Sequence, residues 1–230
     1  MAEHGPLVDP ATIPAWLRPV VEASAKLDAQ MFRQISPPTE DARDAAVLIL
    51  FGEHETRGPD VLLQLRADRG GAHSGQVAFP GGSSEPEDGG PVETALREAV
   101  EETGLDPSGV RPVALLPQLH IPVSGFHVTP VVGHWEKPSR VWAVDLAESA
   151  AVARVPIADL ADPANRFMCR HPSGFTGPAF ALPGMLVWGF TAALLTLLLE
   201  LGDWAEPWDG SDIRDLDAAW RSVRQAVGEV

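Results

Sequence analysis

Residues 81–105 read GGSSEPEDGGPVETALREAVEETGL, a glycine-rich loop that runs into a short acidic helix. Glu101 and Glu102 follow Glu98 by three and four residues, so the three carboxylates project from neighbouring parts of one helix face. Carboxylates packed this closely repel one another unless a cation lies between them. Because Mg²⁺ takes oxygen ligands of this kind, the spacing predicts a metal site at the end of a loop.

The helix in this stretch has defined ends and one apolar side. Pro91 suits a first turn, since its missing N–H has no partner there, and Gly104 suits the left-handed residue just past a helix end. The apolar side adjoins the face of Glu98 and Glu102 and consists of Val92, Ala95, Leu96 and Ala99. We therefore expect the helix to pack on a sheet and to present its acidic edge beside Gly81 and Gly82.

Strands and helices are predicted on both sides of this stretch. The strands lie at residues 45–51, 61–66, 76–79, 111–119, 126–135 and 152–155, and residues 166–171 and 178–182 form a hairpin. The first two strands flank a polar turn, so they too are expected to pair as a hairpin. Helices are predicted at residues 11–34, 157–160, 185–201 and 212–227. This order indicates one α/β domain with helical additions at both ends.

Size and charge limit the classes of partner. The 230 residues, 45% hydrophobic and 21% charged, are enough for one sizeable core and few for two domains. The formal net charge of −15, from 32 acidic and 17 basic residues, argues against nucleic acid or an anionic membrane. The charge does not exclude a small phosphorylated substrate, because bound cations can reverse the local sign of the potential.

Three features bear on the location of the protein. A single cysteine, Cys169, excludes an internal disulfide and suits a reducing compartment. Residues 1–14 lack the basic start and apolar core of a signal peptide, so a cytoplasmic location is expected. Residues 185–201 are rich in leucine but short for a membrane span, and acidic sequence follows them. We expect this segment to be a helix buried on the sheet.

Residues 82–105 resemble the Nudix box, which is a glycine, five residues, an acidic residue and then, after a gap, Arg-Glu-apolar-x-Glu-Glu-x-Gly-apolar. Residues 97–105, REAVEETGL, match the second half at every position. In the first half Asp88 replaces the customary glutamate, and eight residues rather than seven separate it from Arg97. The resemblance implies a Nudix-type α/β/α sandwich with a mixed central sheet. It would form a single domain with its core at about residues 42–202, a helical extension at 1–41 and a tail helix at 203–230.

Upstream of the box the chain is similar to the coenzyme A pyrophosphatase branch of that family. The branch shows the same one-residue insertion, and its signature resembles residues 62–67, LLQLRA, and 73–82, HSGQVAFPGG. Residues 122–126, PVSGF, fit as well. The implied reaction is hydrolysis of the diphosphate of coenzyme A or its thioesters by water. The products would be adenosine 3′,5′-bisphosphate and a phosphopantetheine.

One departure keeps other functions open. Gly70 and Gly71 stand where the branch usually has Leu-Arg, and a glycine cannot supply the guanidinium that would pair with a phosphate. ADP-ribose, a dinucleotide or a nucleoside triphosphate are alternative substrates. A non-catalytic ligand sensor on the same fold is a third interpretation, although all three helix glutamates are present.

The resemblance implies roles for individual residues. Glu98 and Glu102 would be the first ligands of Mg²⁺ or Mn²⁺, followed by Glu101 and the carbonyl of Gly81. Arg97 would orient the site, through a bidentate contact with the carboxylate of Asp88 or Glu85. The residues expected to bind substrate are Arg66, His73, Gln76, Gly81 and Gly82.

Other polar residues are weaker candidates for the functional site. Glu148 and Glu136 are the candidates for a general base. His120, His127 and His134 recur every seven residues, which on strands puts neighbours on opposite faces, so we expect them to be unrelated. Cys169 and His171 lack further ligands at zinc spacing. Assembly into a homodimer is compatible with the sequence.

Overall fold

The computed structural model describes residues 4–28, 42–67, 75–121 and 125–228. Of the features predicted above, His73, the Gly70-Gly71 pair and the end of the first predicted helix lie outside these ranges. So do residues 122–124 of the predicted branch signature.

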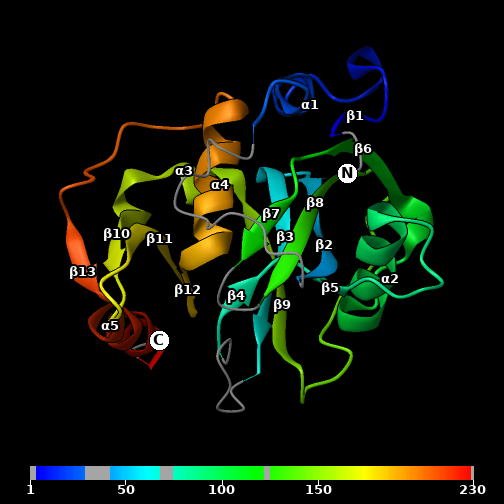
Figure 1. The fold of residues 1–230 in the computed structure, drawn as a ribbon. Helices are drawn as coiled ribbons and strands as arrows, with labels where there is room; N and C mark the ends of the chain where they lie inside the picture. Colours follow the sequence, from blue (N-terminus) through cyan, green and yellow to red (C-terminus); the bar gives the residue numbers. More distant parts are fainter. Residues whose placement is uncertain (1–3, 29–41, 68–74, 122–124, 229–230) are drawn as a thin grey trace.

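A mixed nine-stranded sheet runs through the middle of the molecule (Figure 1). Its strands are β1 (Gly5–Pro6), β2 (Arg43–His54), β3 (Gly58–Arg66), β4 (Val77–Ala78), β5 (Gly81–Ser83), β6 (Val110–Leu115), β7 (Leu119–Ile121), β8 (Phe126–Trp135) and β9 (Ser149–Pro156). Strands β2 and β8 pair in parallel, and the other pairs in this sheet are antiparallel. The predicted mixed sheet is confirmed.

Strand β2 has different neighbours along its length. Phe51 lies opposite Val61 of β3, which confirms the predicted hairpin. Nearer the start of β2, Val47 lies opposite Gly81 of β5. At the level of Gln64, β3 pairs with β4 and β9. Strands β3 and β5 therefore both border β2, but at different levels.

Helices cover both faces of the main sheet, because alternate residues of β2 point to opposite sides. Helix α2 (Pro91–Thr103) buries Ala95 and Ala99 in one apolar cluster with Leu48 and Leu50. Helices α1 (Arg18–Ser24) and α4 (Gly189–Leu201) share the other cluster with Ile49 and Phe51. Figure 1 shows α2 and α4 on opposite sides of the sheet. This is the predicted α/β/α sandwich.

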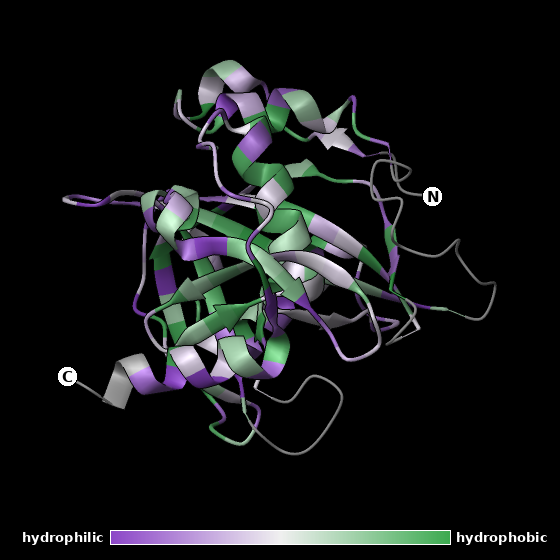
Figure 2. Ribbon diagram, turned by 90° about the vertical axis from the view of Figure 1, so that its left-hand side faces the viewer, coloured by the Kyte–Doolittle hydropathy of each residue, from purple (hydrophilic) through white to green (hydrophobic). Residues whose placement is uncertain are grey.

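A second, four-stranded sheet follows in the C-terminal part of the chain. Its strands are β10 (Arg166–Arg170), β11 (Thr176–Leu182), β12 (Met185–Val187) and β13 (Ile213–Asp215). Strands β10 and β11 form the predicted hairpin. Helix α5 (Leu216–Gly228) packs on this sheet through Leu216, Ala219 and Val223. In Figure 2 this helix carries both hydrophilic and hydrophobic residues, whereas the strands in the middle are mostly hydrophobic.

The short helices make the remaining connections. Helix α3 (Ile157–Ala161) follows β9, close to the predicted turn at 157–160. Three 3₁₀ turns are η1 (Pro10–Thr12), η3 (Pro107–Gly109) and η4 (Pro163–Asn165), and each has an aspartate as its N-cap. Their proline-initiated sequences match the preference of proline for a first turn.

Two of the predicted helices are wrong in extent. In the predicted helix 185–201, Met185–Val187 pairs with β11 as β12, and the helix begins only at Gly189. Gly184 and Gly189 have φ of 72° and 65°, so a left-handed residue lies before the strand and another begins helix α4 after it. In the predicted helix 11–34, α1 begins only at Arg18, because Pro19 is acceptable only in a first turn, and it ends at Ser24.

Two further boundaries differ from the prediction. The predicted strand at 111–119 is divided into β6 and β7, with Pro117 between them. The tail helix starts later than predicted because Ile213–Asp215 joins β10 as β13.

Helix α4 has 13 residues, about 20 Å at 1.5 Å each. Over the ranges given above, no helix is long and apolar enough to cross a bilayer.

Candidate active site

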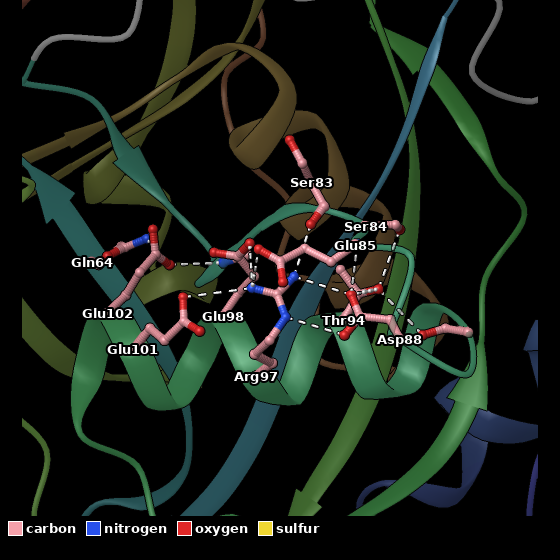
Figure 3. Close-up of polar contacts among 12 residues, drawn as sticks. Gln64, Ser83, Ser84, Glu85, Asp88, Thr94, Arg97, Glu98, Glu101 and Glu102 are labelled. Atoms are coloured by element: carbon pink, nitrogen blue, oxygen red, sulfur yellow. Dashed lines mark hydrogen bonds and ion pairs between the residues drawn. The ribbon is translucent and has the colours of Figure 1, made fainter.

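Arg97 ties helix α2 to the loop that precedes it (Figure 3). Its Nε donates to Oδ1 of Asp88 at 3.1 Å, and its Nη2 donates to Oδ2 at 3.0 Å. Nη2 also donates to the carbonyl of Ser83 at 2.9 Å. The predicted bidentate contact is confirmed with Asp88, while Glu85 lies 3.8 Å from the guanidinium.

Asp88 organises the loop as well as pairing with Arg97. Its Oδ2 accepts hydrogen bonds from the backbone N–H of Glu85 and the hydroxyl of Thr94, both at 2.9 Å. The hydrogen bond from Arg97, followed by that from the Glu85 N–H, holds the pKa of Asp88 well below its ordinary value. The loop is therefore closed around a carboxylate that stays ionised.

Glu102 reaches from α2 to both β3 and β5. Its Oε2 accepts hydrogen bonds from Nε2 of Gln64 at 2.6 Å and from the N–H of Gly81 at 2.8 Å. Its Oε1 lies 4.0 Å from Nη1 of Arg66. Burial raises the pKa of Glu102 to about 7, although both hydrogen bonds and Arg66 act in the opposite direction. The carboxyl is thus held in place in surroundings that disfavour its charge.

Glu98 lies between Gly82 and Arg97. Its Oε1 accepts a hydrogen bond from Nη1 of Arg97 at 3.1 Å. A Cβ on Gly82 would lie 2.6 Å from both carboxylate oxygens of Glu98, so only glycine leaves room for them. Burial raises the pKa of Glu98, and the charge of Glu98 in turn raises that of Glu102.

This pair of carboxylates fits a hard divalent cation. Both are buried enough for desolvation to raise their pKa values, and a cation beside them would offset that desolvation and their mutual repulsion. Glu101 differs: its side chain is 58% exposed and lies 3.5 Å from Arg97. No three His, Cys, Asp or Glu side chains of the described ranges form a complete cation site. The fit therefore concerns Glu98 and Glu102, and the metal role of Glu101 stays a prediction.

The structure brings most of the predicted substrate-binding residues to the same place. Arg66 at the end of β3 is next to Glu102, and its backbone N–H donates to the carbonyl of Gln76 at 2.9 Å. Gly81 and Gly82 form β5 directly beneath the two glutamates. His73 lies outside the described ranges. Arg66 is the only one of this group with a cationic side chain, and 42% of that side chain is exposed.

The two candidates for a general base are far apart. Glu136 follows β8 at its far end, where its carboxylate lies 3.4 Å from Arg111. That end pairs with the end of β2 distant from Gly82, since Phe51 lies opposite His134. Glu148 is exposed, and its carbonyl accepts a hydrogen bond from the N–H of Ala67 at 2.8 Å. Glu148 therefore lies beside Arg66, whereas Glu136 is remote from the helix glutamates.

Two of the recurring histidines are neighbours, contrary to expectation. His120 of β7 lies opposite His127 of β8, and their ring centroids are 5.3 Å apart. The spacing argument fails here because the two residues belong to separate antiparallel strands rather than to one continuous strand. His134 lies at the other end of β8.

Two polar residues of the site were not predicted, Gln64 and Ser149. Gln64 is fully buried on β3, and its Oε1 accepts a hydrogen bond from the hydroxyl of Ser149 at 2.7 Å. The signal for Gln64 is present in the sequence, as one polar residue within the apolar run of the strand. Ser149 follows a long loop of mixed charge, and its sequence context gives no comparable signal.

Comparison with known proteins shows which sequences this chain resembles. The family model described as the NUDIX domain matches residues 41–166. The "Uncharacterized Nudix hydrolase NudL" of Pectobacterium atrosepticum is 36% identical over 177 residues, covering 72% of this chain and 86% of that protein. NudL of Salmonella heidelberg is 41% identical over 125 residues, which are 54% of this chain and 63% of that protein.

Among solved structures, a Nudix hydrolase from M. smegmatis, RenU, gives a TM-score of 0.47 at 20% identity, over 70% of this chain and 86% of that one. The family assignment rests on the sequence matches, and the range matched by the family model spans the glycine loop, Arg97 and the helix glutamates. The chain belongs to the Nudix hydrolase family.

Proposed function

We propose that this Nudix hydrolase cleaves the diphosphate bond of coenzyme A or an acyl-coenzyme A, with Mg²⁺ or Mn²⁺ as cofactor. The observation that carries the reaction type is the partly buried pair Glu98 and Glu102 beside the Gly81-Gly82 backbone. The choice of coenzyme A rests on the likeness of residues 62–67 and 73–82 to the branch signature.

The proposed roles follow from the position of each side chain. Glu98 and Glu102 would hold the cation, with Glu101 and the Gly81 carbonyl as further ligands. When bound, Mg²⁺ or Mn²⁺ neutralises the charge of a diphosphate and lowers the pKa of water. The exposed side of Arg66 can contact a phosphate oxygen. Arg97 holds Glu98 and the glycine-rich loop in position relative to each other.

The bond changes balance without a covalent enzyme intermediate. The oxygen of water bonds to one phosphorus, the bond from that phosphorus to the bridging oxygen breaks, and the bridging oxygen leaves with the other phosphate. The proton released by water needs an acceptor. We assign that role to Glu148, because Glu136 is paired with Arg111 at the far end of β8.

The reaction is tested by incubating the purified protein with Mg²⁺ or Mn²⁺ and a panel of coenzyme A, acetyl-coenzyme A, ADP-ribose, dinucleotides and nucleoside triphosphates. Turnover of coenzyme A or its thioester is expected. Turnover of ADP-ribose alone would refute the coenzyme A assignment and favour the alternative suggested by Gly70-Gly71. No turnover of any substrate would leave a ligand-binding Nudix domain as the function.

The metal role is tested with Glu102→Gln, which should lower kcat/KM by about 100-fold or more, because cation stabilisation of the transition state contributes several kcal/mol. Glu93→Gln is the matched control on the same helix. The Glu93 carboxylate accepts only the N–H of Gly89, outside the site. Near-normal activity of Glu102→Gln would contradict the assignment.

The base is tested separately with Glu148→Gln. We expect kcat to fall by about 100-fold, within the range of general-base contributions, while the affinity for Mn²⁺ is unchanged. Glu136→Gln is the control and should retain full activity. Equal losses in the two variants would argue against Glu148.

A further inference from the structure

A chain of three side chains ends on Glu102 (Figure 3 shows its last link). The hydroxyl of Ser149 donates to Oε1 of Gln64 at 2.7 Å, and Nε2 of Gln64 donates to Oε2 of Glu102 at 2.6 Å. Gln64 has no exposed surface, and Ser149 is 2% exposed. These contacts join β9, β3 and α2, which lie far apart in the sequence.

The carboxylate of Glu102 fixes which way the amide of Gln64 points. Because an ionised carboxylate only accepts, the NH₂ group faces Oε2 of Glu102, and the amide oxygen is left facing the hydroxyl of Ser149, which donates to it at 2.7 Å. If the amide were reversed, its oxygen would face Oε2 of Glu102, and two acceptors would oppose each other. Ser149 is itself held in place, because its N–H donates to the carbonyl of Asp145 at 2.9 Å.

These hydrogen bonds determine how the carboxylate of Glu102 is presented. Oε2 of Glu102 receives two donors, the amide of Gln64 and the N–H of Gly81. Oε1 has Arg66 as a neighbour only at 4.0 Å. One oxygen is therefore fixed by the protein, and the other is presented with lone pairs available to a cation.

We propose that Gln64 is a positioning residue for Glu102 and that Ser149 holds the amide of Gln64 in place from its other end. The two residues hold the carboxylate in the orientation that binds the divalent cation. This inference rests on the metal-ligand role of Glu102 in the proposed function. Partners that orient a metal ligand commonly change metal affinity by 10–100-fold when they are removed.

The test is titration of the metal-free protein with Mn²⁺ alone. Binding is measured by calorimetry or by the loss of the electron paramagnetic resonance signal of free Mn²⁺. Gln64→Met removes the donor at nearly constant volume and should weaken Mn²⁺ binding by about tenfold or more. Gln118→Met is the matched control, since Gln118 also donates to a carboxylate, that of Asp44 at 3.0 Å, but in an exposed contact. It should bind Mn²⁺ as the wild type does.

Ser149 offers a pair of variants with opposite expectations. Ser149→Ala should weaken Mn²⁺ binding several-fold, and Ser149→Thr, which keeps the hydroxyl, should restore wild-type affinity. If Ser149 served only to fill space, the larger threonine would disturb this buried position more than alanine. This pair also decides the matter if Gln64→Met does not fold, which thermal unfolding monitored by circular dichroism would reveal.

The outcomes separate this inference from the proposed function. Wild-type affinity in both Gln64→Met and Ser149→Ala, or equal weakening in Ser149→Ala and Ser149→Thr, overturns the positioning role. A wild-type protein that hydrolyses no diphosphate but binds Mn²⁺ refutes the proposed reaction, and the variant titrations still test the positioning. A wild-type protein that binds no Mn²⁺ overturns both the metal role and the positioning.

Discussion

The space beside Glu98 exists because residue 82 has no side chain. Alanine at this position would place its Cβ 2.6 Å from both oxygens of Glu98, so the carboxylate would have to move. We expect Gly82→Ala to lower kcat/KM by about tenfold or more, since a displacement that loses 1.4 kcal/mol already reaches that factor. Steady-state assays with Mn²⁺ measure the effect.

Gly210→Ala is the control for this substitution. A Cβ at Gly210 would have no heavy atom within 4 Å, and its backbone does not require glycine. This variant should keep wild-type activity and stability. Full activity of Gly82→Ala, in a protein that is folded by circular dichroism, would show that Glu98 is not confined as described.

Asp88 is expected to make the stability of the protein depend on pH under acidic conditions. Its pKa in the folded protein lies below the ordinary value of 3.8, first because Arg97 donates to it. The stability that it contributes is therefore complete above about pH 4 and is lost as the pH falls toward the folded-state pKa. In urea unfolding, wild type and Asp88→Asn should differ by a constant amount from pH 7 to pH 5. That difference should shrink below pH 4.

Arg97, the partner of Asp88, allows this interpretation to be checked. In an Arg97→Met background, the change in stability caused by Asp88→Asn should depend much less on pH, because the main cause of the lowered pKa of Asp88 is gone. A difference between wild type and Asp88→Asn that stays constant down to pH 3 would contradict the interpretation.

Single residues of the site were predictable to different degrees. The contact between Arg97 and Asp88 followed from a local pattern, nine residues apart in the chain. Gln64 and Ser149 are 85 residues apart, and only the pairing of β3 with β9 brings them together. Their partnership could not be inferred from composition or spacing.

At the scale of elements, the C-terminal end of α2 is tied to the loop that follows β8. Gly104 has a left-handed φ of 64°, and a Cβ there would lie 2.7 Å from the ring of Trp142. The backbone N–H of Trp142 donates to the carbonyl of Thr103 at 3.0 Å. Gly104→Ala should lower the free energy of unfolding by about 1–2 kcal/mol from its backbone alone, and more from the clash.

A double-mutant cycle in urea separates these two contributions. In a Trp142→Ala background the clash is absent, so Gly104→Ala should be less destabilising than in the wild type, while the backbone contribution persists. Strict additivity of the two substitutions would show that the ring does not restrict residue 104.

The elements that were predicted correctly have strong local signals. Helix α2 has proline and glycine at its two ends, and β8 matches its predicted bounds. The sequence places Met185–Val187 in a helix, because a short apolar run does not distinguish strand from helix. The segment is a strand because it pairs with β11, and that pairing is a tertiary contact.

The whole molecule contains a second sheet, of which the local patterns indicated only the hairpin of β10 and β11. Its strands are nevertheless joined to the main core, because Phe180, Leu182 and Val187 belong to the same apolar cluster as Ile49 and Phe51. On the outer side, Phe167 and Cys169 share a smaller cluster with α5. This sharing supports the prediction of a single domain, since the second sheet cannot separate without exposing part of the main core.

Cys169 allows the single-domain prediction to be tested, because it is the only thiol in the chain and reports on the second sheet. It is 4% exposed, and burial raises its pKa to about 11 from an ordinary value of 9.0. Since the thiolate is the reactive form, labelling by a disulfide reagent at pH 8 should be about 100-fold slower in the folded protein than in the unfolded chain.

The urea dependence of that labelling is the decisive measurement. If the two sheets unfold together, the midpoint for exposure of Cys169 should coincide with the midpoint from circular dichroism. Cys169→Ala, which has no thiol, gives the background. Labelling that is complete at a urea concentration where the circular dichroism of the main sheet is still native would show that the second sheet opens on its own, and the chain would then consist of two folding units.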